Sequence, residues 1–400
     1  MKVYFLTGEP FPNGMAAANR IKCYARAIKE GGVDCEVVVF RRTERYGVKP
    51  MNTAGQGEIE GGIPFRYIGG TPLRGCNVLK RQIDDRIDVW RAERYLRKNI
   101  LKGDVLMLYM GGNVEIMLRF MKVAHGKGAF CVRDLCELPY GTGAETEKAI
   151  RLRKVTIEKQ FPLLDGIISI SDALLNMART YTLPSCKHIK VPILVDFEQY
   201  YIPDQSAKAE IPYIFHAGTL LEQKDGILGM IEAFGKAKQR VSTPIRYILT
   251  GNVEKSSHPR ELKSIICKYQ LEDSVVFVGY LMREQIKEYL RNASLVISNR
   301  TKSKQDYYGF STKVGEYLAS GIPLITTNWG EAVNWLSDGE SAYITEPGNT
   351  DALADVIVRV FSNPEEARRI GLAGQEVCRQ SFDYRVWSHP LVEFFNSLGK

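Results

Sequence analysis

Short apolar runs alternate with longer stretches of mixed polar and apolar residues along the whole chain. The runs are typical of buried strands, and helical patterns fill most of the gaps between them. Strands that alternate with helices form parallel sheets covered on both faces, so the pattern predicts an α/β protein with doubly wound sheets. We expect strands at ten segments: Val3–Leu6, Glu36–Phe40, Val105–Tyr109, Phe130–Val132, Gly166–Ile170, Tyr213–Phe215, Arg246–Leu249, Val275–Val278, Leu295–Ile297 and Leu324–Thr326.

The length of the chain indicates two domains. With 400 residues and 44% hydrophobic content, the chain exceeds what one core usually supports. A polar stretch with three prolines runs from Val191 to Pro212, and we place the boundary there, with domains at 1–200 and 201–380. The apolar run at the N-terminus is too short for a secretory signal, and no run approaches the roughly 20 residues of a transmembrane helix.

The segment from Gly309 to Ile325 reads as a loop, a short helix and a buried strand. Ser311 is a favoured N-cap residue and Gly321 a favoured helix stop, so we expect a helix over roughly 312–320. The N-terminus of such a helix offers free backbone N–H groups and the positive end of the helix dipole. The segment therefore predicts an anion site.

A single carboxylate lies one turn inside this expected helix. Glu316 follows Thr312 by four residues and shares its face, where it can accept two hydrogen bonds from a ribose diol. The N–H groups of Ser311, Thr312 and Lys313 suit a phosphate. Together they predict a nucleotide site. The alternative is an ordinary capped helix whose Glu316 is merely solvated.

This segment resembles the C-terminal signature of retaining glycosyltransferases of family 4, E-G-F-G followed by L-E-A-x-A-x-G-x-P-V. Glu316 matches the second glutamate of the signature, which holds the ribose, and Tyr308 stands where the first glutamate contacts the transferred sugar. Gly309 and Phe310 follow as in the signature. A subset of bacterial polysaccharide transferases carries a different pattern, which the following residues resemble: Asn299, Arg300, Ser311, Thr312, Lys313, Glu316 and Tyr317.

The start of the second domain adds candidates for binding a diphosphate. Gly218 and Thr219 follow an expected strand, and a glycine there lets the backbone approach a ligand at the carboxyl end of the sheet. In family 4 an arginine and a lysine of this region clamp the diphosphate. Thr219 replaces that arginine, Lys224 keeps the place of the lysine, and we expect Arg300 to supply the missing cation. A surface lysine and a surface arginine are the alternatives.

The resemblance implies a GT-B fold, with two facing doubly wound Rossmann-like domains and a cleft between them. It implies an acceptor domain at 1–200, a nucleotide-sugar domain at 201–380 and a helix at 381–400 that returns to the first domain. The implied activity is transfer of a sugar from a UDP- or GDP-sugar, with retention, to a glycan or lipid-linked acceptor. Lys224, Arg300 and the helix N-terminus would stabilise charge on the leaving diphosphate, without a metal ion or cofactor.

The first domain contributes further candidates. Asn13 and Gly14 lie in a loop of small residues between the first strand and a helix, and such a backbone suits an acceptor or a phosphate. Arg133, Asp134 and Glu137 follow another strand and are acceptor or sugar candidates, although salt bridges explain them equally well. We expect Ser171 to be an N-cap residue.

The excess of positive charge lies in the first half of the chain. Residues 1–200 carry 31 Lys and Arg against 22 Asp and Glu, a net charge of +9, whereas residues 201–400 carry 23 against 24. Basic residues crowd the stretches 74–98 and 151–159. A solvated face is one interpretation, and attraction to an anionic membrane surface that carries a lipid-linked acceptor is the other. Nucleic acid is disfavoured because neither stretch lies in a known recognition module.

The chain lacks motifs that are typical of several other classes of protein, which disfavours those classes. The eight cysteines form no C-x-x-C and no zinc-ligand spacing, which indicates reduced thiols in a cytoplasmic protein, peripheral to the membrane at most. A nucleotide-dependent oxidoreductase is disfavoured because no G-x-G-x-x-G follows a strand. A nucleotide-sugar 2-epimerase with GT-B architecture and a non-enzymatic nucleotide-sugar binder remain alternatives.

Overall fold

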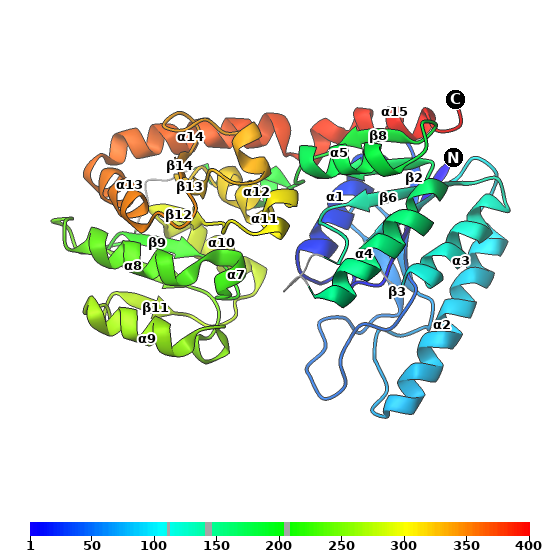
Figure 1. Ribbon diagram of the computed structural model, residues 1–400, viewed down its shortest axis with the longest axis horizontal. Coiled ribbons are helices and arrows are strands. Elements are labelled where there is room, and N and C mark those ends of the chain that lie inside the picture. Colours follow the sequence, from blue (N-terminus) through cyan, green and yellow to red (C-terminus); the bar gives the residue numbers. More distant parts are fainter. Residues whose placement is uncertain (110–112, 141–145, 204–208) are drawn as a thin grey trace. The chain divides into compact units, whose positions relative to one another are not determined.

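The computed structural model describes residues 1–109, 113–140, 146–203 and 209–400. These residues form two compact units (Figure 1). Unit 1 comprises Met1–Val195 and Tyr384–Lys400, and unit 2 comprises Asp196–Asp383. Each unit is built on one sheet against which helices pack.

The sheet of unit 1 has eight strands in the order β3-β4-β2-β1-β5-β6-β7-β8. All neighbours are parallel except β3 and β4, which pair antiparallel at one edge. The strands are β1 (Lys2–Thr7), β2 (Asp34–Val39), β3 (Gln56–Ile59), β4 (Ile63–Tyr67), β5 (Val105–Tyr109), β6 (Phe130–Leu135), β7 (Gly166–Ser169) and β8 (Lys187–Lys190).

The helices of unit 1 connect these strands and carry the chain's last residues. They are α1 (Ala16–Glu30), α2 (Val78–Asn99), α3 (Val114–His125), α4 (Glu147–Lys159), α5 (Asp172–Tyr181) and α15 (Ser388–Asn396), with short 3-10 helices at Phe161–Leu163 and Tyr384–Trp387. Although α15 is far away in the sequence, it packs on α1. The Ser388 hydroxyl donates to the Ala27 carbonyl at 2.6 Å, and Leu391 and Phe395 join the core.

Unit 2 has a six-stranded parallel sheet in the order β11-β10-β9-β12-β13-β14. This is the order 3-2-1-4-5-6 of Rossmann folds. The strands are β9 (Tyr213–His216), β10 (Arg246–Leu249), β11 (Val275–Phe277), β12 (Leu295–Ser298), β13 (Leu324–Thr327) and β14 (Tyr343–Thr345).

The helices of unit 2 alternate with these strands, and α13 packs on α8 to close one side of the core. They are α6 (Phe197–Tyr200), α7 (Glu222–Asp225), α8 (Ile227–Lys238), α9 (Pro259–Lys268), α10 (Arg283–Asn292), α11 (Lys304–Tyr308), α12 (Thr312–Ala319), α13 (Thr350–Ser362) and α14 (Pro364–Ser381). Short 3-10 helices lie at Val253–Lys255 and Glu331–Asn334.

All ten segments predicted as strands form strands, but four further strands were missed. These are β3, β4, β8 and β14. β3, β8 and β14 lie at sheet edges, where a strand needs no continuous apolar run, and β4 alternates buried with half-buried residues. The expectation of parallel sheets is wrong only for the β3–β4 pair. No helix in the described ranges has the length and apolar content to cross a membrane.

Candidate functional site

The carboxyl ends of β9 and β12 meet at the centre of the unit 2 sheet, where the strand order reverses. Ligands of open α/β sheets bind at such a switch point. The loop with Gly218 follows β9, and Asn299 follows β12. The buried His216 ring joins the two strands, with Nδ1 at 2.9 Å from the Ile297 carbonyl oxygen. The sequence candidates of the second domain therefore gather around this point.

Gly218 lies where no side chain fits. A Cβ at this position would overlap Nε2 of His216 and approach Oδ2 of Asp225 to 2.9 Å. The hydroxyl of Thr250 fixes the peptide, since it accepts from Gly218 N–H at 2.7 Å and donates to Gly218 C=O at 2.9 Å. The loop therefore presents bare backbone at the carboxyl edge of the sheet.

The helix predicted over roughly 312–320 is α12, and its N-terminus is open. Ser311 is the N-cap residue as predicted, but its side chain accepts no hydrogen bond from the helix. No acidic residue lies in the first turn. The first-turn N–H groups at Thr312 and Lys313 thus remain available to an anion.

Glu316 is a largely enclosed carboxyl one turn inside α12. Burial raises its pKa above the usual range, while Arg283, a hydrogen bond from the Tyr200 hydroxyl and Lys313 act in the opposite direction. Tyr200 belongs to α6, which packs on α12. The carboxyl is therefore held by its neighbours, which contradicts the alternative of a merely solvated side chain.

Lys313 pairs with Asp225, the last residue of α7. Its Nζ lies 2.6 Å from Oδ1 of Asp225, whose side chain is 7% exposed. Burial disfavours the charged carboxylate, yet Lys313 and His216 together hold the pKa of Asp225 far below its usual range. Burial also lowers the pKa of Lys313, which Asp225 and Glu316 oppose and Arg300 reinforces. Lys313, Asp225, Arg300 and Glu316 thus form one charged cluster.

Arg300 is held by an acidic partner that the sequence did not indicate. Its Nη1 lies 2.8 Å from Oδ1 of Asp306, a buried residue of α11. Oδ2 of Asp306 accepts from the N–H and the hydroxyl of Thr301, at 3.2 and 3.0 Å. The Arg300 side chain is 23% exposed, and its guanidinium has donors beyond the one used by Asp306, so it can still contact a ligand.

The remaining candidates of unit 2 differ in exposure. Lys224 and Thr219 are exposed, and no side-chain partner of Lys224 occurs among the described residues. Tyr308 ends α11, and its ring packs edge-on against Tyr307. Gly309 is the C-cap residue of α11. Phe310 is buried against Phe382, so its side chain belongs to the core and only its backbone remains a ligand candidate.

The candidates of unit 1 lie at the carboxyl edge of its sheet. Asn13 is tied to a neighbouring loop, since its N–H donates to Oδ1 of Asn52 at 2.8 Å. Gly14 precedes α1, whose N-cap residue Met15 provides no side-chain cap. Glu137 follows β6 and is half buried.

Arg133 and Asp134 lie inside β6 and not beyond it. Asp134 is buried and accepts from Nε of Arg20 on α1 at 3.1 Å. Arg133 is also buried and bonds to the Gln160 amide oxygen. Both are therefore explained by internal pairs, which was the alternative to an acceptor role. Ser171 is the N-cap residue of α5, as predicted, and accepts from Leu174 N–H at 3.2 Å.

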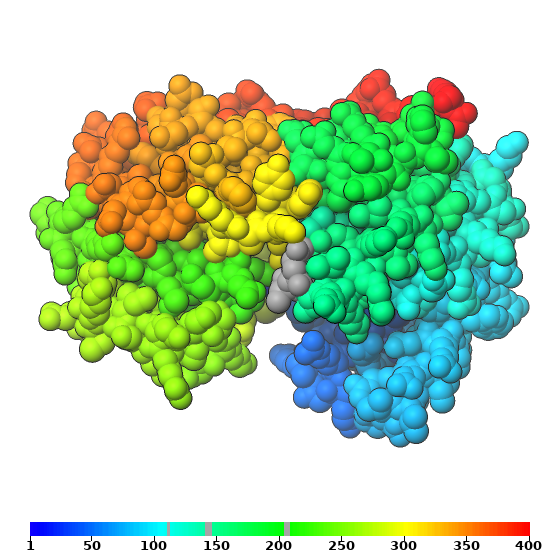
Figure 2. All heavy atoms as spheres, in the orientation of Figure 1, coloured from blue at the N-terminus to red at the C-terminus, as the bar shows by residue number. Residues whose placement is uncertain are grey.

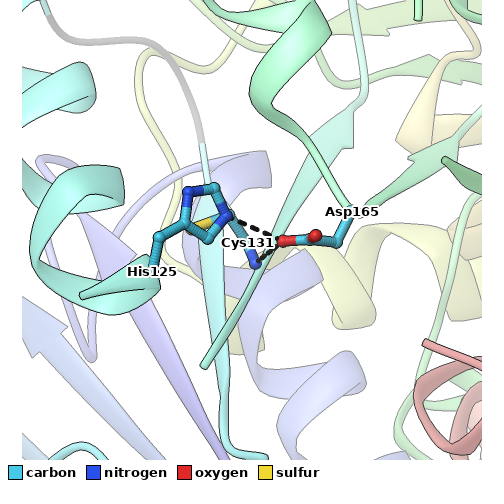
Figure 3. Close-up of side chains that lie close together, drawn as sticks. All are labelled: His125, Cys131 and Asp165. Atoms are coloured by element: carbon cyan, nitrogen blue, oxygen red, sulfur yellow. Dashed lines mark hydrogen bonds and ion pairs between the residues drawn. The ribbon is translucent and has the colours of Figure 1, made fainter. Parts of the chain in front are cut away.

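One group in the described part of the chain brings three potential metal ligands together, namely His125, Cys131 and Asp165 (Figure 3). Oδ2 of Asp165 lies 2.9 Å from Nε2 of His125 and accepts from Cys131 N–H at 2.7 Å. Burial raises the pKa of the Cys131 thiol well above its usual range, which disfavours the thiolate that a metal needs. The group lies at the amino ends of β6 and β7, away from their carboxyl edge. The hydrogen bonds of Asp165 explain why these three residues lie together.

Several residues that organise the site were missed from the sequence. Asp225 and Asp306 hold the two cations. Tyr317 was named from the resemblance, but its contact was not foreseen: its hydroxyl accepts from Ala217 N–H at 2.8 Å, which fixes the loop after β9. Asp225 stands 88 positions from its partner Lys313. Its place directly after Lys224 was the one available signal.

The comparisons with known proteins agree with this geometry. Residues 201–377 match the family model described as glycosyl transferases group 1. Unit 2 carries a glycosyltransferase group 1 domain. The matched range contains both loops of the switch point and the whole of α12.

Relatives of known name match over most of the chain. The amylovoran biosynthesis glycosyltransferase AmsK of Erwinia amylovora is 25% identical over 305 residues, which cover 76% of this chain and 72% of that protein. WcaL of Salmonella typhimurium, a glycosyltransferase named for colanic acid biosynthesis, is 23% identical over 387 residues, which cover 88% and 89%. Both names refer to polysaccharide biosynthesis.

Solved structures share the fold over the full length. A sucrose-phosphate synthase from Thermosynechococcus elongatus aligns with a TM-score of 0.74 at 17% identity, covering 99% of this chain and 98% of that one. Anabaena HepE, solved in complex with UDP-glucose, aligns with a TM-score of 0.70 at 16% identity over 100% of both chains. The predicted fold class, GT-B with two Rossmann-like α/β units, is confirmed.

Proposed function

We propose that this protein is a glycosyltransferase that moves a sugar from a nucleotide-diphosphate sugar to a glycan or lipid-linked acceptor in cell-surface polysaccharide synthesis. The group 1 domain and the names of the relatives support transfer and polysaccharide synthesis. The observation that carries the proposal is Glu316, an enclosed carboxyl one turn inside an open helix N-terminus and beside Lys313.

This arrangement suits the two ends of a nucleoside diphosphate. The first turn of α12 offers N–H groups and a positive dipole to a phosphate, while Glu316 can accept from both hydroxyls of a ribose. Gly218 places backbone beside Asp225, the partner of Lys313, and Thr219 follows it in the chain. We propose a UDP- or GDP-sugar, and the complexes of HepE with UDP and UDP-glucose favour UDP.

The proposed reaction leaves negative charge on the departing diphosphate. Arg300, Lys224 and the N-terminus of α12 would stabilise that charge, and preorganised groups of this kind supply much of the catalysis in such sites. Lys313 would contribute more weakly because Asp225 neutralises it. We propose front-side displacement with retention, in which a phosphate oxygen takes the proton of the acceptor hydroxyl. A metal ion is not needed in this scheme.

The acceptor side of the proposal rests on unit 1. Asn13, Gly14 and Glu137 lie at the carboxyl edge of its sheet, where a glycan can meet backbone and carboxylate. Tyr308, Gly309 and Phe310 are proposed to border the transferred sugar from unit 2. All eight cysteines are unpaired, which supports a cytoplasmic location.

An assay of nucleoside diphosphate release tests the proposal against its rivals. Purified protein is incubated with UDP-glucose, UDP-galactose or GDP-mannose, with and without simple glycosides and a lipid-linked glycan as acceptors. Release that requires an acceptor supports a transferase. Release without an acceptor, together with an isomerised sugar, would instead identify a 2-epimerase. Binding of a donor without any turnover would identify a non-enzymatic binder.

A further inference from the structure

Helix α2 has two apolar faces, of which only one is buried. Val89, Ala92 and Leu96 face the core of unit 1. On the other side, four large apolar side chains are exposed, with exposed fractions of 68% for Leu79, 56% for Ile83, 39% for Ile87 and 53% for Trp90. At 3.6 residues per turn these four positions fall within about 80° of the helix circumference. They form a continuous stripe, called here the α2 stripe.

Positive charges flank the α2 stripe on both sides. Arg86 and Arg97 lie along one edge and Lys80, Arg91 and Lys98 along the other, by the same helical geometry, and all five are exposed. Of these, only Arg91 pairs with an acidic residue in the described part of the chain, at 3.6 Å from Asp88. Arg94 lies over the Trp90 ring, with its guanidinium carbon 5.7 Å from the ring centroid.

The acidic residues of α2 do not balance these cations. Each of them is engaged by a basic residue of unit 1, as in the contact of Asp84 with Arg42 at 2.5 Å and of Glu93 with Arg119 at 2.5 Å. Asp85 pairs with Arg74 at 3.7 Å, and Asp88 is buried. The side of α2 that carries the stripe therefore presents apolar groups and positive charge only.

The second basic stretch of unit 1 has a different character. On α4, Lys154 pairs with Glu158 at 3.6 Å, and Lys159 pairs with Glu115 on α3 at 3.2 Å. Nε of Arg153 donates to the Pro139 carbonyl at 2.9 Å. These three cations take part in contacts within unit 1, whereas Lys148 and Arg151 of α4 are exposed. Among the described residues, α2 still carries more exposed cations without an acidic partner than α4 does.

We propose that α2 is a membrane-binding helix, whose α2 stripe enters the interface of an anionic lipid bilayer while the flanking cations contact the headgroups. An amphipathic helix with Trp and Leu on one side and Lys and Arg beside them binds in this way, parallel to the bilayer surface. Trp90 and Arg94 suit the boundary between acyl chains and headgroups. Charge complementarity selects an anionic bilayer over a protein partner. The light-blue surface of α2 is uncovered in Figure 2.

Co-sedimentation of the full-length protein with vesicles tests the proposal. The wild type should bind vesicles that contain phosphatidylglycerol at low salt and not vesicles of phosphatidylcholine alone. It should be released at 1 M salt, where the Debye length falls to about 3 Å. Removing three cations with Arg86→Gln, Arg97→Gln and Lys98→Gln should weaken binding about 100-fold, at about fivefold for each cation.

A matched variant tests whether vesicle binding depends on the position of the cations on α2 or only on the net charge of the protein. Lys148→Gln, Arg151→Gln and Lys154→Gln remove three exposed charges from α4 of the same unit, and we expect less than about a threefold loss of binding. The apolar variant Leu79→Ser, Ile83→Ser should also abolish binding. All the replaced side chains are exposed or at the helix surface, so circular dichroism and the unfolding midpoint should match the wild type.

Trp90 reports insertion directly, because it is the one exposed tryptophan of the four. Its emission should shift to shorter wavelength with anionic vesicles, and Trp90→Phe should remove that shift. Three results would overturn the proposal: wild type that stays in the supernatant with anionic vesicles at low salt, equal losses in the α2 and α4 charge variants, or a dimer in solution that Leu79→Ser, Ile83→Ser dissociates. Binding of UDP or GDP by the same variants tests the donor site separately.

Discussion

The ion pair of Asp225 and Lys313 gives the sharpest prediction about the charged cluster. Asp225→Asn keeps the size of the side chain and removes its charge. Lys313 then loses its partner at 2.6 Å, while its own burial continues to disfavour the ammonium form. We expect the variant to unfold more easily and the pKa of Lys313 to fall further.

The magnitude follows from the burial of the two groups. Removing one partner of a fully buried pair costs about 3–5 kcal/mol. The Lys313 side chain is 24% exposed, so water can hydrate part of the freed ammonium, and we expect a loss of about 1–3 kcal/mol in the free energy of unfolding. For a unit of this size, each 1 kcal/mol lowers the unfolding midpoint by roughly 2–4 °C.

A matched control is available in the same unit. Lys236 and Asp351 form a similarly close pair at 2.8 Å, but the Asp351 side chain is 81% exposed. Asp351→Asn should cost under about 1 kcal/mol because solvent screens such pairs. Differential scanning calorimetry of the two variants without nucleotide compares a buried pair with an exposed one. Equal midpoint shifts would refute the reasoning that burial makes the Asp225 charge important.

The difference in unfolding free energy between the wild type and Asp225→Asn should change with pH in a definite direction. The pKa of Asp225 lies below its unfolded value in the folded protein, so its charge contributes stability above about pH 4. That contribution is lost as the pH falls toward the folded pKa. The gap in unfolding free energy between the wild type and Asp225→Asn should therefore be constant from about pH 5 to 7 and narrow below about pH 4. A gap that widens under acid would contradict the assignment.

Two further predictions concern the residues around the cluster. Arg300→Ala should lower turnover by about 100-fold or more, which is the effect of losing one preorganised donor. The loss should exceed that of Lys224→Arg, because the latter variant keeps a cation. A wild-type rate for Arg300→Ala would show that this arginine only holds Asp306. Gly218→Ala should lower the unfolding midpoint and weaken nucleotide binding, because the new methyl group overlaps the His216 ring. The control Gly229→Ala lies on α8, where a Cβ meets only the Thr350 methyl group at 3.4 Å. It should stabilise the folded protein by up to about 1 kcal/mol. Midpoints that move in the same direction for the two glycine variants would contradict this reading of the loop.

The parallel core of the fold was predictable because its strands are buried on both faces. Such strands appear as short apolar runs, and every run that was identified became a strand. The edge strands β3 and β8 were not predictable in this way, since their residues stay exposed or half buried, and the edge strand β14 has only 3 residues. The sequence of β8, Lys187–Lys190, has no residue that the structure fully buries.

The candidate site was predictable where local chemistry defines it. Ser311 and Gly321 bounded α12 because caps and stops are local signals, and the spacing within the helix placed Glu316. The pair of Lys313 and Asp225 was not predictable, because these residues lie 88 positions apart. Asp306 lies only 6 positions after Arg300, but a single sequence does not show that α11 turns it back onto the guanidinium. The stripe on α2 was also missed. Its apolar residues resemble core positions until the structure shows which of them are exposed.

Calorimetric titration of the nucleotide tests most directly whether Glu316 and the N-terminus of α12 form a nucleoside diphosphate site. UDP and GDP are titrated into the wild type, into Glu316→Gln, and into Glu376→Gln, which changes an exposed glutamate of α14. We predict that one of the two nucleotides binds the wild type and Glu376→Gln equally. Glu316→Gln should bind it about 10- to 100-fold more weakly, the loss of about 1–3 kcal/mol expected for a charge-assisted hydrogen bond. Equal affinity in all three proteins, or no binding of either nucleotide to the wild type, would contradict the proposed site.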